Sequence, residues 1–413
     1  MKKIVLALCA FVGFSCASMI GMDALGEEQV LGGTASAAGR GFAGNAKTGD
    51  AEGLSVVNPA RLAFDAKVVF NLNFLVEMDA AEKGGNHYTS TNLSLPSFNL
   101  SFPMNEFGAL GLSLWQHYSS SFKEDYANSK TMSDVEIEYK GSVYELVPSY
   151  AIRLPFWRSL SLGASAHVVM GNTSRQLTLG GNTSDLPKED AWASSKSKIS
   201  DYVDGTWEIK DHPAYYTAAL QYRGPMVSYF FSFTTGYTLK NTLDYNFRFS
   251  EIDTLASTRY VREIDVPALL ATGINYRLNK RHNIMVDFLW RAWDDDIENL
   301  AGGWNLPQTT KTQKDFMISL GYQCDGSPLF YESYWKRINY RVGTWYRNWY
   351  IKDVFEVGGS LGGGFPLGRK GTTVDLAVQG GKRFADIDNQ WDETFIGLRV
   401  GLTGIATWGM ERR

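Results

Sequence analysis

The sequence predicts an all-β chain, a 14-stranded antiparallel transmembrane β-barrel with a small N-terminal plug (hatch) inside the lumen. Three observations support this fold class. From about residue 66, apolar and polar residues alternate with period two, as in strands whose faces meet different solvents. The connections between these runs are alternately short and long, which is typical of bacterial outer-membrane barrels. No stretch after the first 17 residues is apolar for long enough to form a transmembrane helix.

The first element, residues 1–17, has the composition of a secretory signal. A basic start precedes the apolar stretch 4–14, and Ser15-Cys16-Ala17 supplies the small residues that a signal peptidase recognises. We therefore expect cleavage after Ala17; lipidation of Cys16 is disfavoured because the residues before it do not fit the required pattern. The mature chain then keeps one cysteine, Cys324, which excludes an internal disulfide and a cysteine-rich metal site.

The second element, residues 18–65, is the predicted plug. It does not alternate and is rich in small residues, which suits a segment packed inside a barrel. Within it, Gly39-Arg40-Gly41-Phe42-Ala43-Gly44 has the spacing of a dinucleotide-binding loop. That loop needs a preceding apolar strand and a βαβ unit, and the sequence pattern provides neither, so no cofactor is expected.

The third element, residues 66–413, is the predicted barrel. Its first run places Val68, Phe70 and Leu72 on one face and Asn71 and Asn73 on the other. A soluble β-propeller or sandwich would also alternate, but with shorter strands and without the long and short loops. Because every backbone group in lipid needs an internal partner, the sheet must close. The runs lie near 66–78, 93–104, 108–119, 141–154, 159–171, 212–223, 226–239, 262–278, 283–294, 314–323, 337–347, 353–365, 372–383 and 394–408.

The connections and the aromatic residues assign the two ends of the barrel. The longest connections span 120–140, 172–211 and 240–261, and the even number of strands places both chain termini at the short-turn, periplasmic end. Aromatic girdles are expected at both membrane interfaces. The short-turn girdle comprises Phe102, Tyr150, Tyr222, Tyr276 and Tyr322, and the opposite girdle comprises Tyr118, Tyr237, Trp290 and Tyr346.

Charged residues on the strands alternate onto the lumen face. An Arg or Lys on the lipid face at mid-membrane would cost about 2–4 kcal/mol, so this confinement supports the register. We expect Asp287 and Arg291 to lie against Asp315, and Arg341 against Glu356. A network that stiffens the wall and tethers the plug is favoured over a site for a ligand carboxylate at Arg291 or Arg341. The candidate residues are Asp287, Arg291, Asp315, Arg341, Glu356, Asp375 and Arg399.

The sequence contains no catalytic or metal-binding pattern, so the protein is not expected to be an enzyme. Its five histidines are scattered without the spacing of metal ligands, and there is no nucleophile elbow. Ser165 and His167 share a strand face, a spacing that commonly arises by chance. The net charge of −4 offers no basic surface for nucleic acid.

Glycine and proline mark special positions in the strands. Gly358-Gly359 and Gly362-Gly363-Gly364 suggest close approach of the plug, or alternatively a lateral gate. Pro96 and Pro148 lie inside runs and remove a donor from the ladder, so each could also mark a disrupted strand.

The plug sequence resembles the FadL/OMPP1/TodX superfamily of outer-membrane transport proteins. The resemblance is carried by Ala37-Ala38-Gly39-Arg40-Gly41, by Asp50-Ala51 and by Asn58-Pro59-Ala60. It implies a plug whose motif residues are Gly39, Gly41, Asp50, Asn58, Pro59 and Ala60. It also implies passive diffusion of long-chain fatty acids or aromatic hydrocarbons through a lateral opening. The basic C-terminal end is similar to those of FadL-related proteins of the Bacteroidetes, and the plug motif is shared with the PorV-like shuttle of type IX secretion.

These features predict a monomeric channel for a hydrophobic small molecule in the lipid of a Gram-negative outer membrane. The alternative is a PorV-like barrel that binds or shuttles exported proteins. A simple structural porin is a third hypothesis, distinguished by ion conductance without displacement of the plug.

Overall fold

A computed structural model describes residues 18, 20, 25–29, 33–49, 54–83, 86–104, 108–120, 122–128, 133–181, 200–209, 211–249, 252–299, 308–368, 371–385 and 392–406. The expected signal, residues 1–17, lies outside the described residues, as does Asp50 of the plug motif. No described helix is long and apolar enough to cross a membrane.

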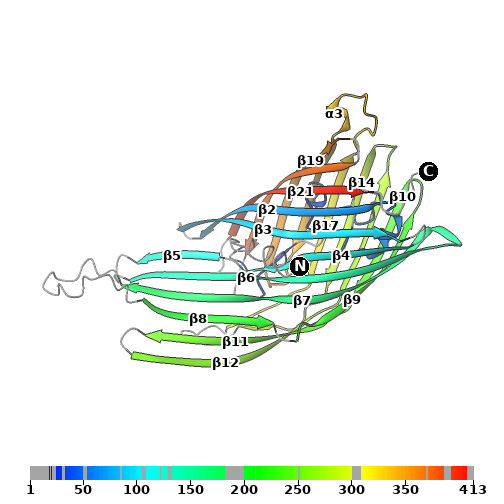
Figure 1. Ribbon diagram of the computed structural model, residues 1–413. Coiled ribbons are helices and arrows are strands. Elements are labelled where there is room, and N and C mark those ends of the chain that lie inside the picture. Colours follow the sequence, from blue (N-terminus) through cyan, green and yellow to red (C-terminus); the bar gives the residue numbers. More distant parts are fainter. Residues whose placement is uncertain are drawn as a thin grey trace.

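Fourteen antiparallel strands close into a barrel of the outer-membrane type, as predicted. Each strand pairs with its neighbours, and the seam closes where β2 pairs with β21, from Val68–Ala406 to Glu82–Asp392 (Figure 1). Closure joins the two ends of the sheet, as backbone groups in lipid require. The barrel strands are β2 (Val68–Lys83), β3 (Asn86–Pro103), β4 (Gly108–Ser119), β6 (Ser133–Leu154), β7 (Trp157–Gly181), β9 (Ala214–Arg223), β10 (Val227–Thr234), β13 (Leu269–Arg277), β14 (His282–Arg291), β17 (Asp315–Cys324), β18 (Asn339–Asn348), β19 (Val354–Leu367), β20 (Thr372–Ala385) and β21 (Asp392–Ala406).

The predicted long loops contain further strands. β5 (Phe122–Asn128), β8 (Ser200–Ile209), β11 (Tyr237–Phe249) and β12 (Ile252–Val266) extend the wall beyond the barrel on one side (Figure 1). Two predicted runs were therefore wrong at their ends. The run 226–239 divides at Thr235-Gly236 into β10 and β11, and the run 262–278 divides at Pro267 into β12 and β13. A separate hairpin pairs β15 (Ile297–Asn299) with β16 (Gln308–Thr310).

Alternation along the strands separates the lipid face from the lumen. On β14, Val286 and Phe288 are exposed whereas Asp287 between them is buried. The girdle residues Tyr150, Tyr276 and Tyr346 are among the exposed side chains.

Two of the residues assigned to the opposite girdle do not face lipid. Tyr118 is fully buried, and the ring of Tyr237 stacks on Tyr215 with centroids 4.4 Å apart. The assignment of Tyr118 failed because β4 changes register against β6 between Gln116 and Tyr118, which turns the end of β4 inward. Tyr237 begins the separate strand β11.

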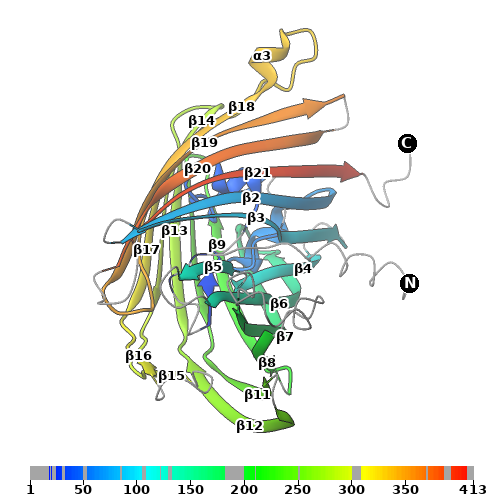
Figure 2. The same ribbon diagram turned by 90° about the vertical axis from the view of Figure 1, so that its left-hand side faces the viewer.

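The N-terminal segment lies inside the barrel (Figure 2). It contains β1 (Glu27–Glu28), one helical turn α2 (Ala35–Ala38) and a 3₁₀ turn η1 (Pro59–Phe64). Thr34 caps α2 by accepting a hydrogen bond from the Ala37 amide at 3.0 Å.

The first described residue lies at the end of the barrel opposite to the one expected. Ser18 donates a hydrogen bond to Glu393, next to the start of β21. The plug therefore begins toward the long-hairpin end and descends to the short-turn end, where β2 starts at Val68. The remaining helical turn, α3 (Tyr334–Arg337), lies between β17 and β18 and stands away from the wall (Figures 1 and 2).

Candidate functional site: plug anchors and a wall groove

Two glycines of the plug motif allow the plug backbone to touch the wall. Gly41 has φ +62°, and a Cβ there would lie 2.5 Å from the Thr344 amide nitrogen. A Cβ on Gly39 would lie 3.0 Å from the Cα of Gly362, a member of the glycine run on β19. Gly362 is therefore a point of close approach, whereas a Cβ on Gly359 would meet nothing nearer than 3.6 Å.

Asp287 holds the plug turn that follows. Its Oδ2 accepts hydrogen bonds from the backbone amides of Gly44 and Asn45 at 3.0 and 2.8 Å, and from the Asn45 side chain at 2.9 Å. The carboxylate lies on the lumen face, as predicted, but it binds the plug and not a neighbouring strand. Charged acceptors of backbone N–H groups form strong hydrogen bonds, so this contact fixes the turn.

Asn58, Pro59 and Ala60 lie at the short-turn end of the plug. The Asn58 amide donates to Gln221 at 2.5 Å, and the Ala60 carbonyl accepts from Ser161 at 2.8 Å. Pro59 begins η1, where a missing N–H costs nothing. A Cβ on Gly163 of β7 would lie 2.2 Å from the Ala60 nitrogen, so glycine is required at that position of the wall.

The strand β1 attaches the other end of the plug to the lumen. Glu28 forms ion pairs with Arg291 and Arg347, and its Oε1 lies 3.1 Å from His117 Nε2. The Arg347 guanidinium also donates to the Glu28 carbonyl at 2.8 Å. Burial opposes ionisation, but Arg291 and Arg347 hold the pKa of Glu28 below its ordinary value. Arg291 is thus directed at the plug, and Asp315 lies 3.6 Å from Arg347.

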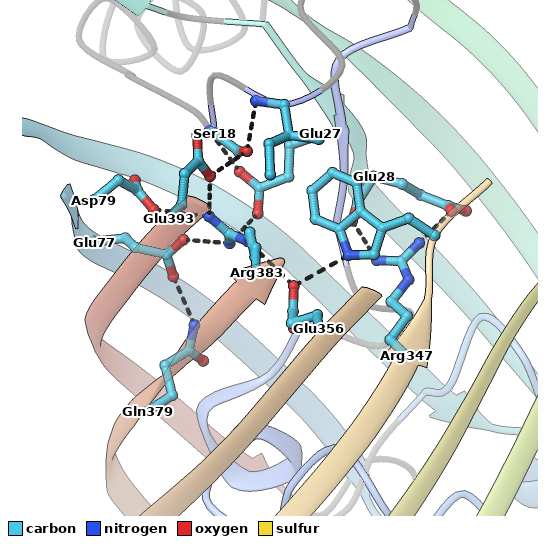
Figure 3. A network of polar contacts seen from close by, with 12 residues as sticks. Ser18, Glu27, Glu28, Glu77, Asp79, Arg347, Glu356, Gln379, Arg383 and Glu393 are labelled. Carbon is cyan, nitrogen blue, oxygen red and sulfur yellow. Dashed lines mark hydrogen bonds and ion pairs between the residues drawn. The ribbon is translucent and has the colours of Figure 1, made fainter. Parts of the chain in front are cut away.

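Arg383 carries the second attachment of β1. Its guanidinium contacts Glu27 at 2.8 Å and four wall carboxylates (Figure 3). Those four are Glu77, Asp79, Glu356 and Glu393. Glu356 also accepts from Trp345 Nε1 at 2.6 Å. Adjacent residues of β1 therefore reach two separate ion clusters.

The predicted pairing of Arg341 with Glu356 was wrong. Arg341 contacts Asp375 of β20 at 2.5 Å, because β19 places glycines between the two side chains. Glu356 lies opposite Arg347 and not opposite Arg341. Gln323 accepts from Arg341 at 3.2 Å and from Arg40 of the plug at 2.9 Å. Arg399 donates to the Gly33 carbonyl at 3.0 Å, so it too is in contact with the plug.

A chain of buried polar side chains extends from β1 into the wall. His117 Nδ1 lies 2.5 Å from Glu145 Oε1, and Glu145 Oε2 lies 2.9 Å from His167 Nδ1. His167 Nε2 then approaches Ser165 at 3.2 Å and Thr217 at 2.9 Å. The shared Glu145 and the competing Thr217 hydroxyl make this a structural chain that orients two imidazoles.

The wall is interrupted at two places near the prolines singled out in the sequence. The pairing of β3 with β4 begins only at Ser97–Trp115, one residue after Pro96. Beyond that point β1 takes the edge of β4, with Glu27 opposite Ser119 and the Gln29 amide donating to the His117 carbonyl at 2.8 Å.

The second interruption lies at Pro148. The pairing of β6 with β7 stops at Leu146–Val168 and resumes at Ser149–Ser165. A groove of about 490 Å³ lies over this point. Its rim is apolar and exposed, with Leu110, Tyr150, Tyr216 and Phe233. Ser149, Ser165 and Thr217 also line it, but their side chains are buried.

The residues that sequence reasoning missed are Glu27, Glu28, His117, Arg347 and Arg383. Arg347 shares the face of Arg341, and Arg383 shares the face of Asp375, so period-two alternation could have found both. The two glutamates stand in a segment without periodicity and gave no such signal.

Comparison with known proteins extends the structural findings. The family model BamG matches residues 24–413. The curated proteins give no match.

The predicted resemblance to FadL and TodX is confirmed for the fold. A Pseudomonas aeruginosa FadL homologue aligns with a TM-score of 0.62 at 14% identity, over 95% of this chain and 99% of the homologue. The Pseudomonas putida toluene transporter TodX aligns with a TM-score of 0.58 at 13% identity, over 92% and 98%. The CymD monoaromatic hydrocarbon channel aligns with a TM-score of 0.55 at 16% identity, over 92% and 98%. Because the family model covers the chain from residue 24 to its end, the protein belongs to the BamG family.

Proposed function

We propose that the protein is a passive outer-membrane transporter for hydrophobic small molecules, of the long-chain fatty acid or aromatic hydrocarbon class. The observation that carries this proposal is the groove at Pro148, which lies where the backbone pairing of the wall is interrupted. A hydrophobic ligand suits its apolar rim. The names of the structural relatives TodX and CymD, a toluene transporter and a monoaromatic hydrocarbon channel, support the same ligand class.

The proposed route joins an internal apolar cluster to this groove. Toward the long-hairpin end, buried apolar side chains of the plug and wall pack together, among them Leu25, Tyr118, Trp349 and Tyr350. The segments 172–211 and 240–261 are the proposed capture region, from which the ligand moves to the apolar cluster. When the plug shifts, the ligand passes from the cluster to the groove and leaves sideways into the lipid.

Pro148→Val tests the route because valine supplies the backbone donor that proline lacks at the interruption of the β6–β7 pairing. We expect slower uptake of a long-chain fatty acid and of toluene by cells that depend on this protein. Pro366→Val, in the paired end of β19, is the matched control and should leave uptake unchanged. Deletion of residues 36–60 should also alter uptake. Equal uptake by cells with and without the protein would refute the proposal.

A second candidate function, a barrel that binds exported proteins in the manner of a PorV-like shuttle, is favoured by one observation. The connection between β17 and β18 exposes a group of large apolar side chains, Leu329, Phe330, Tyr331, Tyr334 and Trp335. Exposed clusters of this kind are typical of protein-binding surfaces. Under this function, Trp335→Ala and Tyr331→Ala should reduce co-purification of exported proteins without changing hydrocarbon uptake.

A further inference from the structure

The carboxylates around Arg383 outnumber the cation that they contact. Five of them lie 2.8 to 3.3 Å from one guanidinium: Glu27, Glu77, Asp79, Glu356 and Glu393. None of these carboxylate side chains is more than 9% exposed. The Oδ2 atom of Asp79 is buried without a hydrogen-bond partner. Buried negative charge of this kind is costly unless a further positive charge is supplied.

Ser18 reaches into this cluster (Figure 3). Its backbone nitrogen donates to Glu27 Oε2 at 3.1 Å, and its hydroxyl donates to Glu393 Oε2 at 2.5 Å. The residue has no exposed surface. Ser18 is also the residue that directly follows the expected signal-peptidase site, Ser15-Cys16-Ala17.

We propose that the Arg383 cluster is a binding site for the α-ammonium group of the mature chain, which cleavage between Ala17 and Ser18 creates. A signal peptidase catalyses the step, and water is the second reactant. The bond between the Ala17 carbonyl carbon and the Ser18 nitrogen breaks. The oxygen of water joins that carbon as a carboxylate, and both water protons end on the Ser18 nitrogen as an ammonium group.

The change in charge and in donors fits the cluster. An amide at Ser18 is neutral and offers one donor, whereas an ammonium group adds a positive charge and offers three. With the amide in place, burial raises the pKa of Glu27 to about 7. The attraction of Arg383 lowers this pKa, and repulsion from Glu77 raises it. An ammonium group at 3.1 Å would favour the ionised carboxylate and satisfy further acceptors. Processing thereby strengthens the attachment of β1, whatever ligand the barrel carries.

Chemical labelling tests the site directly. The protein is purified in the folded state, its N-terminal residue is identified by mass spectrometry, and it is acetylated with an amine-reactive ester. We expect Ser18 at the N-terminus, with its amine reacting at least tenfold more slowly than in the urea-unfolded chain. Lys240, whose side chain is 47% exposed, is the internal control and should react similarly in both states. A different N-terminal residue, or an α-amine in the folded protein that reacts as fast as in the unfolded chain, would overturn the proposal.

An insertion variant tests the position of the ammonium group while it leaves the sequence from Ser18 onward unchanged. Inserting Ser-Gly between Ala17 and Ser18 keeps the cleavage junction and moves the ammonium group by about 7 Å. We expect the Gln29 amide, which donates to the His117 carbonyl, to exchange its hydrogen at least tenfold faster. Asp79→Asn should restore slow exchange in this variant because it removes one excess charge, but it should not slow exchange in the parent. The same insertion between Gly224 and Pro225, in a short turn, is the control for folding. Unchanged exchange, or an equal effect of Asp79→Asn in both chains, would contradict the proposal.

Discussion

Glu28 offers the sharpest test of how the plug is held. Its carboxylate faces Arg291, Arg347 and His117, and both arginine side chains are at most 6% exposed. Glu28→Gln preserves shape but removes the carboxylate that Arg291 and Arg347 share, and leaves Arg347 with Asp315 at 3.6 Å. Removing one partner of a buried ion pair costs about 3–5 kcal/mol, because the remaining charge stays desolvated.

That cost should appear as faster local opening of β1. The Gln29 amide reports on it, and we expect its hydrogen exchange to accelerate by roughly a hundredfold to several thousandfold. The measurement is native-state exchange followed by mass spectrometry in lipid nanodiscs. Glu263→Gln is the control, because the Lys240–Glu263 pair is exposed and worth at most about 1 kcal/mol. Less than a threefold acceleration in Glu28→Gln would refute the view that charge anchors the plug.

Three further predictions follow from the same contacts. Gly163→Val should lower the free energy of unfolding in urea by about 1–3 kcal/mol through overpacking against the plug, whereas Gly359→Ala should have little effect. In a cysteine-free background, an impermeant maleimide added to whole cells should label Glu263→Cys but not Tyr331→Cys; labelling of both would contradict a periplasmic short-turn end. In a chain extended before Ser18, Glu27 has its pKa raised to about 7, so protonation favours the docked plug. Docking should then be strongest below about pH 4.5 and weaken as the pH rises through 7, and Glu27→Gln should reduce this dependence, as seen by hydrogen exchange.

The sequence predicted the wall better than the interior. The number of strands and the faces of their residues follow from local alternation, which arises where a strand has two differently solvated faces. This alternation placed Asp287, Arg341 and Asp375 on the lumen face, where they are buried. Which lumen charge meets which depends on the strand shear and on the path of the plug, and neither is encoded locally. Arg291 was expected beside Asp315, and the two are cross-strand neighbours. The ion pair of Arg291 with Glu28, 263 positions earlier in the chain, was not expected.

The inward turn of β4 shows a related limit. The alternation was extended through the whole run 108–119, so Tyr118 was expected on the lipid face. The burial alternates only as far as Leu114, and every residue from Trp115 to Ser119 is buried. The register shift against β6 and the partner β1 reverse that assignment. A pattern of period two fails wherever a bulge inserts one residue. The alternation of this run breaks at Trp115-Gln116, directly before the register shift.

The pairing of β1 with β4 has a consequence for the order of assembly. The plug is made first, yet it contacts strands from the start of the barrel to its last strand, including Asn73 and Arg399. We expect its segment to be enclosed before the β2–β21 seam forms, because it contacts strands on both sides of that seam. Contacts so distant in sequence form slowly. We therefore expect that a plug left outside when the seam forms stays outside. The β2–β21 pairing would have to open before the plug could enter the lumen.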